Sequence, residues 1–453
     1  MSRRTVLTLA AVCAVAVGTL YFPQAISPLI AAGLGTSPDA ASLVVTATQV
    51  GYTAGLFLLV PLGDRFPHRP LLVTLLALTG LGLLAAGCAP SLGFLAAAGM
   101  FTGITTVAAQ IIVPMAAGLV GADRRGAVLG TLLSGSIGGM LLARTFGATL
   151  GERLGWRAPY LVAAVLLLLL AAVLAVAVPR TPPPARRPYG ALLADSLRLL
   201  RSESRLRRSC LYQGAVFGGF SAVWTCAALL LTGPAYGLGP QAVGLLALVG
   251  AATMFCTPLA GRMVDRWGPD PVNLVCLLAV LVSAAVLAAG VRGGVPGLAA
   301  LTVGTLMLDI AMQSGMIANQ ARVLAVRADA RSRLNTAYMT CAYLGGSAGS
   351  WLGVRVYGRA GWQGVCVLVA ALAAVALAHH LTAGRSVARP GGAPPGPRGT
   401  AARRRRGAAA APRGAGWRRR RAPPGGPRGR APRPGPPPPP PPLRPVSGRR
   451  VRR

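Results

Sequence analysis

The chain has 453 residues, of which 53% are hydrophobic and 12% charged, and it carries a formal net charge of +36. So few charges, together with apolar runs of about twenty residues, exclude an ordinary soluble globular protein. All 46 cationic residues are arginines, so the chain lacks the lysine of a P-loop ATPase and that of a Schiff-base enzyme.

Twelve apolar stretches follow one another from Thr5 to about Leu381. A helix of about 20 apolar residues, rising about 1.5 Å per residue, crosses the ~30 Å hydrocarbon core of a bilayer. The predicted fold class is an all-α membrane protein with twelve transmembrane helices in two six-helix pseudo-symmetric bundles. The helices are predicted at residues 5–29, 39–62, 71–90, 92–119, 126–150, 157–178, 210–232, 241–261, 271–291, 296–320, 334–357 and 361–382. The first stretch lacks a small-residue cleavage site, so we expect a retained helix.

Four regions follow from this pattern: an N-terminal bundle (1–178), a cytoplasmic central loop (179–209), a C-terminal bundle (210–383) and a tail (384–453). The two bundles repeat short features at matching places. These pairs are Asp64-Arg65 with Asp265-Arg266, and Gly155-Trp156 with Gly361-Trp362. Two repeats of six helices are typical of transporters whose substrate site lies between the halves.

The arginines of the loops predict the orientation, because cytoplasmic loops are enriched in positive charge. Twenty loop arginines fall on one side, and the other side holds only Arg153, Arg157, Arg292 and Arg359. We therefore expect a multi-pass protein of the cell (plasma or inner) membrane with both termini in the cytoplasm.

Two loop motifs and several helix segments carry a family resemblance. The loop after the eighth helix reads Gly261-Arg262-Met263-Val264-Asp265-Arg266-Trp267-Gly268, and its N-terminal copy keeps Gly63, Asp64, Arg65 and Arg69, with Val60 at the usual first glycine. The segments are Tyr21-Phe22-Pro23-Gln24, Thr48-Gln49-Val50-Gly51-Tyr52, Gly138 to Arg144, and Arg333 to Thr340. Over about residues 1–383 the chain resembles the major facilitator superfamily, in its bacterial sugar-efflux and drug-efflux-like permease branch. The resemblance implies the major facilitator fold, with a cavity built mainly by helices one, four, seven and ten. Unlike many drug exporters, predicted helix five contains no proline.

The paired loop motifs are candidate gating motifs, with the residues Gly63, Asp64, Arg65, Arg69, Gly261, Asp265, Arg266 and Gly268. An aspartate at a helix N-terminus gains about 0.3–1 kcal/mol from the helix dipole. We expect Asp64 to face the start of helix eleven near Leu334, and Asp265 the start of helix five near Gly126. Such contacts would hold the cytoplasmic gate closed; a solvated salt bridge to the adjacent arginine is the alternative.

Asp309 is the only carboxylate well inside the predicted hydrocarbon region, where a charge costs about 2.5–3.5 kcal/mol. It is the proton-coupling candidate; the alternative is a structural aspartate bonded to neighbouring helices. Arg144 is the only arginine deep in a predicted helix, and it is the candidate substrate or charge partner. Its depth differs from that of Asp309 by roughly 10 Å, so direct pairing needs tilt. Snorkelling to the outer interface is the alternative for Arg144.

Amides, phenols and an indole occur within the apolar helices and suit a sugar-like or mixed polar solute. The cavity candidates are Tyr21, Gln24, Gln110, Gln213, Trp224, Gln313, Asn335 and Tyr338. Structural bonds between helices explain several of them equally well. Gly345, Gly349 and Gly353, at four-residue spacing, predict a close helix contact.

No catalytic triad pattern or metal-ligand spacing appears among His68, His379 and His380, so we expect neither an enzyme, a metal nor a cofactor. The eight cysteines contain no C-x-x-C pair, which favours apolar packing over disulfides. The tail holds twenty arginines and no acid, so it should be disordered. It either contacts anionic lipid, binds nucleic acid non-specifically, or is a reading-frame artefact without function; we prefer the last reading or a solvated tail.

The sequence thus predicts a secondary active exporter that moves a small polar or amphipathic solute by alternating access in exchange for protons. Two alternatives stay open: an importer or uncoupled facilitator, and a membrane-anchored interaction protein that acts through its basic tail. The expected partners are the lipid bilayer, a small solute and protons, with no specific nucleic acid, and the expected state is a monomer.

Overall fold

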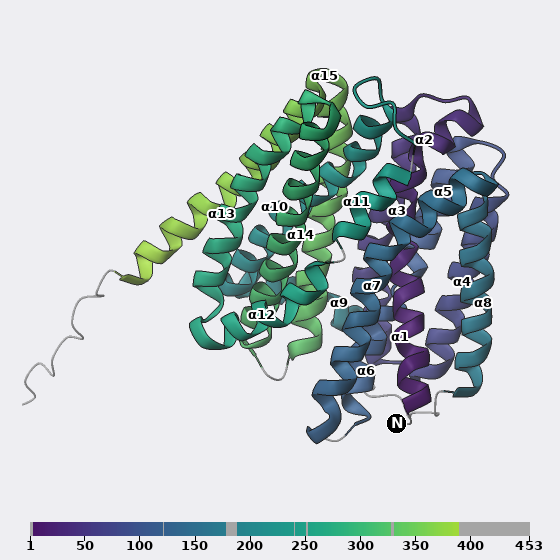
Figure 1. Ribbon diagram of the computed structural model, residues 1–453. Coiled ribbons are helices and arrows are strands. Elements are labelled where there is room, and N and C mark those ends of the chain that lie inside the picture. Colours follow the sequence, from purple (N-terminus) through teal and green to yellow (C-terminus); the bar gives the residue numbers. More distant parts are fainter. Residues whose placement is uncertain are drawn as a thin grey trace, which may run out of the picture. The chain divides into compact units, whose positions relative to one another are not determined.

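The computed structural model describes residues 3–120, 122–177, 188–239, 241–250, 252–327 and 330–388. Within these ranges the secondary structure is helical and contains no strand. The helices run side by side through one compact unit, Met1–Arg389 (Figure 1). The predicted tail starts at residue 384, but residues 384–388 belong to the last helix. Residues 389–453 and residues 178–187 of the central loop lie outside the described residues.

The helices before the central loop follow the first six predicted stretches. They are α1 (Arg3–Gly18), α2 (Phe22–Leu34), α3 (Pro38–Leu58), the 3-10 helix η1 (Val60–Asp64), α4 (His68–Gly87), α5 (Leu92–Thr105), α6 (Ala108–Gly118), α7 (Ala122–Leu154) and α8 (Ala158–Ala177). The first stretch is bent by 41° between α1 and α2. Pro23 at the start of α2 cannot donate a backbone hydrogen bond to the preceding turn, which explains the break.

The later helices follow stretches seven to twelve. They are α9 (Tyr189–Ser202), α10 (Ser204–Thr232), α11 (Gln241–Gly250), α12 (Thr253–Trp267), α13 (Pro269–Ala288), η2 (Ala289–Arg292), α14 (Gly294–Leu324) and α15 (Arg331–Ala388). The eighth stretch is divided into α11 and α12. The last two stretches together make up α15, in which non-helical backbone at Gly361 separates two helical parts.

Nine helices of the described residues are long and apolar enough to cross a membrane, and α1 with α2 makes a tenth. The break at Gly361 divides α15 into two predicted stretches, which gives an eleventh crossing, and α11 with α12 gives a twelfth. The structure is therefore consistent with twelve crossings. The all-helical membrane fold predicted from the sequence is confirmed.

The repeated Gly-Trp pairs mark equivalent turns. Gly155, which precedes α8, has a φ of 86°, and Gly361, inside α15, has a φ of 58°. Both values lie in the left-handed region, where a side chain is strained and glycine is not. The internal repeat therefore preserves a backbone conformation that only glycine adopts readily.

The predicted central loop contains a helix that the sequence analysis missed. In α9, Leu192, Ser196 and Leu199 are buried and share one face at a spacing of three to four residues. Helix α10 also begins at Ser204, before the predicted start of the seventh stretch at residue 210. The polar composition of this region hid both elements, because an amphipathic helix on the surface needs only one narrow apolar face.

The predicted close contact of Gly345, Gly349 and Gly353 is confirmed. These glycines of α15 face α10, where a Cβ on Gly345 would collide with the Gly214 backbone and one on Gly349 with the Gly218 backbone. Small residues let helices approach closely in a membrane, where dispersion forces replace the hydrophobic effect.

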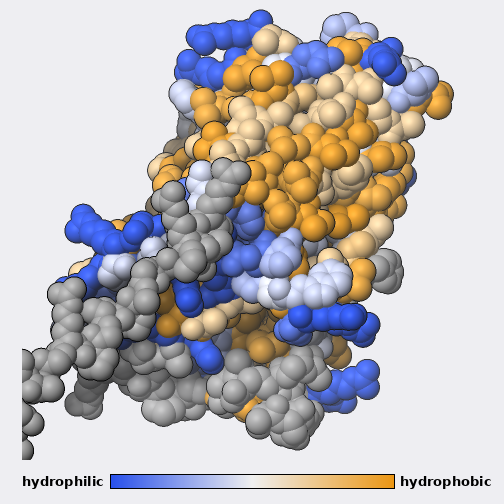
Figure 2. Space-filling view, turned by 90° about the vertical axis from the view of Figure 1, so that its left-hand side faces the viewer, coloured by the Kyte–Doolittle hydropathy of each residue, from blue (hydrophilic) through white to orange (hydrophobic). Residues whose placement is uncertain are grey.

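Apolar side chains cover the outside of the helices at mid-height. Figure 2 shows them as a broad belt, with hydrophilic residues above and below. On α13, for example, Val275, Leu278 and Val282 are about half exposed, at 56%, 46% and 52%. In water such a surface would be an aggregation site, whereas in a bilayer it contacts acyl chains.

Candidate functional site

Asp309 lies in the middle of α14 and is only 1% exposed. One carboxylate oxygen, Oδ1, accepts a hydrogen bond from the indole Nε1 of Trp224 in α10 at 2.9 Å. The other, Oδ2, has no hydrogen-bond partner among the described residues. Gly250, at the end of α11, adjoins it, and a Cβ there would lie 2.7 Å from Oδ2. The carboxylate is therefore enclosed but only half bonded.

Arg144 in α7 is completely buried, so the snorkelling alternative is wrong for this side chain. Its Nε donates to Oε1 of Gln24 in α2 at 3.0 Å. Its guanidinium carbon lies 4.1 Å from the ring centre of Trp224 and 5.0 Å from that of Tyr21. Neither Nη1 nor Nη2 has a hydrogen-bond partner in the described part of the chain.

Trp224 connects the two charged groups. Its ring edge donates to Asp309, and its ring face lies beneath the Arg144 guanidinium. No ion pair within 4.0 Å joins Arg144 to Asp309 in the described chain; instead, each group contacts the indole of Trp224. This agrees with the expectation from helix depth that direct pairing is difficult.

The other polar candidates divide into two groups. Tyr21 lies beside Arg144, and its hydroxyl is 3.3 Å from that of Tyr343. Gln213 lies eleven residues before Trp224 on α10, away from the two charged groups, and its buried amide has no partner among the described residues. The remaining candidates bond to or lie among neighbouring helices. Gln110 donates to Tyr52 at 3.4 Å, Asn335 accepts from Gln320 at 2.9 Å, Tyr338 donates to the Met316 carbonyl at 3.3 Å, and Gln313 is buried one turn after Asp309.

Aromatic side chains that the sequence analysis did not single out surround this region. The ring of Phe220 lies 5.5 Å from the Arg144 guanidinium, and Phe217 stacks on Phe220 at 5.5 Å. Tyr343 contacts Phe217 at 4.8 Å and Tyr52 at 4.5 Å, edge to face. We call Tyr21, Tyr52, Phe217, Phe220, Trp224 and Tyr343 the aromatic cluster. The chain has only 24 Phe, Trp and Tyr residues, and six of them gather here. The sequence does not reveal this cluster, because its members come from separate parts of the chain.

The first gating motif contacts the helix that the sequence analysis expected. Asp64, at the end of η1, accepts a hydrogen bond from Ser332 Oγ at 3.1 Å, in the first turn of α15. Gly63 packs on Ile111, Arg65 caps η1, and Arg69 lies in the first turn of α4. The contact joins the N-terminal helices to the start of α15.

The second gating motif spans the end of α12. Gly261 and Asp265 lie in α12, the Arg266 guanidinium lies 5.9 Å from the Trp267 ring, and Gly268 precedes α13 with a φ of 81°. The expected partner region of Asp265, around Gly126, lies outside the residues whose side chains are described.

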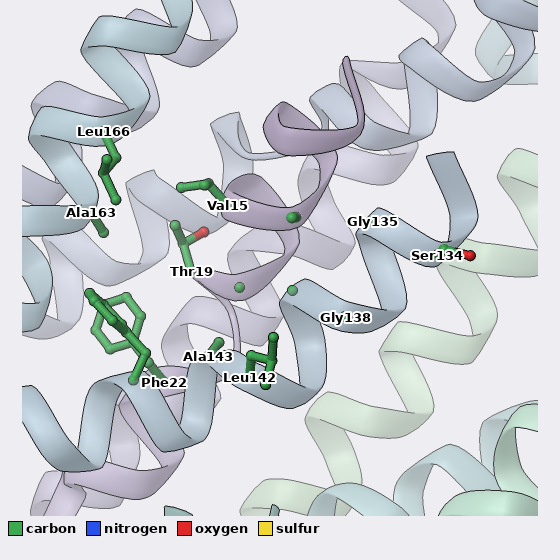
Figure 3. Close-up of a pocket in the computed structure, with 14 residues that line it drawn as sticks. Val15, Thr19, Phe22, Ser134, Gly135, Gly138, Leu142, Ala143, Ala163 and Leu166 are labelled. Atoms are coloured by element: carbon green, nitrogen blue, oxygen red, sulfur yellow. The ribbon is translucent and has the colours of Figure 1, made fainter. Parts of the chain in front are cut away.

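Two hollows adjoin these helices. The first, of about 370 Å³, lies between α1, α7 and α8 and is lined by apolar side chains and glycines, with Thr19 and Ser134 the polar exceptions (Figure 3). Neither Arg144 nor Asp309 lines this hollow, so its chemistry suits an acyl chain more than a polar solute. The second, of about 430 Å³, lies between α3 and α15 and includes Asp39, Arg355 and Arg359. Among the described residues, no group of three or more His, Cys, Asp or Glu is placed to hold a metal ion.

Sequence and structure comparisons agree with this architecture. A family profile described as Major Facilitator Superfamily matches residues 7–291 and 210–425. The uncharacterized transporter YgaY of Escherichia coli O157:H7 is 35% identical over 362 residues, covering 80% of this chain and 91% of that protein. A chloramphenicol resistance protein of Streptomyces lividans is 31% identical over 264 residues, covering 57% of this chain and 67% of that protein. The inward-facing crystal structure of a bacterial homolog of the human lysosomal transporter Spinster shares the fold, with a TM-score of 0.67, 15% identity and coverage of 85% and 98%.

Proposed function

The chain belongs to the major facilitator superfamily of membrane transporters, and from this premise we propose that it is a proton-coupled exporter of a small polar or amphipathic solute. Transport proceeds by alternating access, with the central site open to one side of the membrane at a time. The protein resides in the cell (plasma or inner) membrane with both termini in the cytoplasm, which the distribution of loop arginines supports.

One observation carries the proposal: a half-bonded carboxylate, Asp309, is buried in the middle of α14 near a buried arginine whose Nη1 and Nη2 have no hydrogen-bond partner among the described residues. An ionisable group at such depth is costly, and in transporters it typically belongs to a substrate or proton path. Gly250 and Trp224 leave one carboxylate oxygen available to a proton. Export rather than import is supported by the similarity to a chloramphenicol resistance protein.

Gradient-driven transport in inside-out vesicles tests the proposal. We expect an imposed pH gradient, acidic inside, to drive accumulation of at least one member of a panel of polar and amphipathic solutes that includes chloramphenicol. Asp309→Asn should abolish this accumulation, because the amide cannot bind and release a proton. Glu152→Gln, at the exposed outer end of α7, is the matched control and should transport normally. Accumulation that persists in Asp309→Asn would remove the carboxylate from the coupling mechanism.

A further inference from the structure

The guanidinium of Arg144 keeps hydrogen-bonding capacity that the described protein does not use. Nε is bonded to Gln24, while Nη1 and Nη2 are buried and without a partner among the described residues. A guanidinium has five N–H donors and binds a carboxylate through two parallel hydrogen bonds. A buried charge that lacks hydrogen-bonded compensation costs several kcal/mol, so this position favours an added anionic group.

Asp309 does not supply that group in this arrangement. Its Oδ1 is bonded to the indole N–H of Trp224, and among the described residues no ion pair within 4.0 Å joins the carboxylate to the guanidinium. The aromatic contacts do not supply it either. Rings stacked on a guanidinium satisfy its face, whereas the N–H bonds lie in its plane and stay available to an acceptor.

The surroundings of Arg144 fit a flat apolar body next to an anionic group. Trp224, Tyr21 and Phe220 lie within 4.1, 5.0 and 5.5 Å of its guanidinium carbon. The rest of the aromatic cluster continues from Phe220 through Phe217 to Tyr343. Aromatic side chains offer large apolar faces that pack well against planar ligands.

A second cationic region lies between α3 and α15, the helices that contribute Tyr52 and Tyr343 to the aromatic cluster. Arg355 and Arg359 line the hollow between α3 and α15, against a single carboxylate, Asp39. The hydroxyl pairs Thr46–Ser350 and Thr53–Ser347, each 3.3 Å apart, continue along this seam toward the aromatic cluster. A cleft with excess positive charge concentrates anions.

We propose that the site around Arg144 binds the anionic group of an amphipathic organic anion whose flat apolar body packs on the aromatic cluster. This inference rests on the proposed transport function, since it names the substrate class of the same site. The Arg144 Nη1 and Nη2 groups donate to the anion, Gln24 holds the guanidinium in place, and the rings contact the apolar part.

Equilibrium binding to the purified full-length protein in nanodiscs tests the inference without any gradient. The probes are radiolabelled salicylate, phenylacetate and 1-naphthoate, each compared with its neutral amide. We expect at least one carboxylate to bind about tenfold or more tightly than its amide, which corresponds to about 1.4 kcal/mol. Arg144→Gln should remove this preference. Asp309→Asn should keep or strengthen it, because a neighbouring negative charge is lost. Arg153→Gln, an exposed arginine of the same helix, is the matched control.

Three results would overturn the inference: no carboxylate binds, the amides bind as tightly, or the preference survives Arg144→Gln. The comparison of carboxylate with amide binding uses the wild-type protein, so it tests the inference even when Arg144→Gln fails to fold. The two proposals fail separately. Carboxylate binding through Arg144 without gradient-driven transport refutes proton-coupled export alone, whereas gradient-driven export of neutral solutes with no carboxylate preference refutes the anion site alone.

Discussion

Trp224 shows how one side chain organises the candidate site. It contributes a hydrogen-bond donor to Asp309 and a ring face to Arg144, and it is fully buried. As an aromatic group in an apolar helix, it is one of the cavity candidates predicted from the sequence. Its two partners come from α7 and α14, so no local pattern reveals that it contacts both. The residue types of the site were predictable, and their connection was not.

Gly250 offers a test at this scale, because a Cβ there would lie 2.7 Å from Oδ2 of Asp309. In Gly250→Ala the carboxylate has to turn away, which strains its hydrogen bond to Trp224. Overpacking of this kind costs about 1–3 kcal/mol, so gradient-driven transport should fall roughly tenfold or more. Initial rates in vesicles measure this, with Gly130→Ala as control, since nothing lies within 4 Å of a Cβ there. Equal rates in both variants would contradict the proposed role of the Asp309 environment.

Helix α9 connects elements that come before and after the central loop. The Tyr189 hydroxyl donates to the Leu58 carbonyl at the end of α3, at 2.6 Å. Asp195 accepts from Arg333 in the first turn of α15, also at 2.6 Å. Burial raises the pKa of Tyr189, so the phenol stays a donor at neutral pH. Together with the Asp64–Ser332 contact, these bonds hold the start of α15 against the end of α3.

Loss of the α9 contacts should weaken closure at this end of the helices. Each hydrogen bond contributes about 0.5–1.5 kcal/mol, so Tyr189→Phe combined with Asp195→Asn should shift the conformational population several-fold toward separation. Double electron–electron resonance between spin labels at the starts of α4 and α13 measures this shift. We expect a new component at longer distance in the distance distribution. Gly190→Ala is the control on the same helix, because a Cβ there meets nothing within 4 Å. An unchanged distance distribution in the double variant would show that α9 does not hold this end closed.

At the scale of the whole molecule, the described helices extend from Arg3 to Ala388. The remaining residues hold most of the excess positive charge, with nineteen arginines and no acid from Arg389 onward. The family match lies mostly within the helices, with its second segment extending to residue 425, and every residue of the candidate site belongs to the helical part. We therefore predict that transport requires the helical unit and not the tail.

Deletion of residues 389–453 tests this prediction. We expect the truncated protein to insert in the membrane and to transport at the wild-type rate, since no residue of the candidate site is removed. Membrane yield by immunoblot and initial transport rate per molecule are the two measurements. Normal insertion with transport lost would show that the basic tail takes part in function.

The sequence by itself determined the helical membrane fold. A chain in a bilayer must satisfy its backbone hydrogen bonds internally, so long apolar runs can only be helices. The same reasoning singled out Asp309 and Arg144, because a charge within such a run is rare and costly. Only the tertiary structure decided that Trp224 contacts both of them, that six aromatic residues gather in a cluster that reaches Arg144, and that α9 joins α3 to α15. These contacts join residues far apart in the chain, and helix packing, which local sequence patterns do not encode, brings them together.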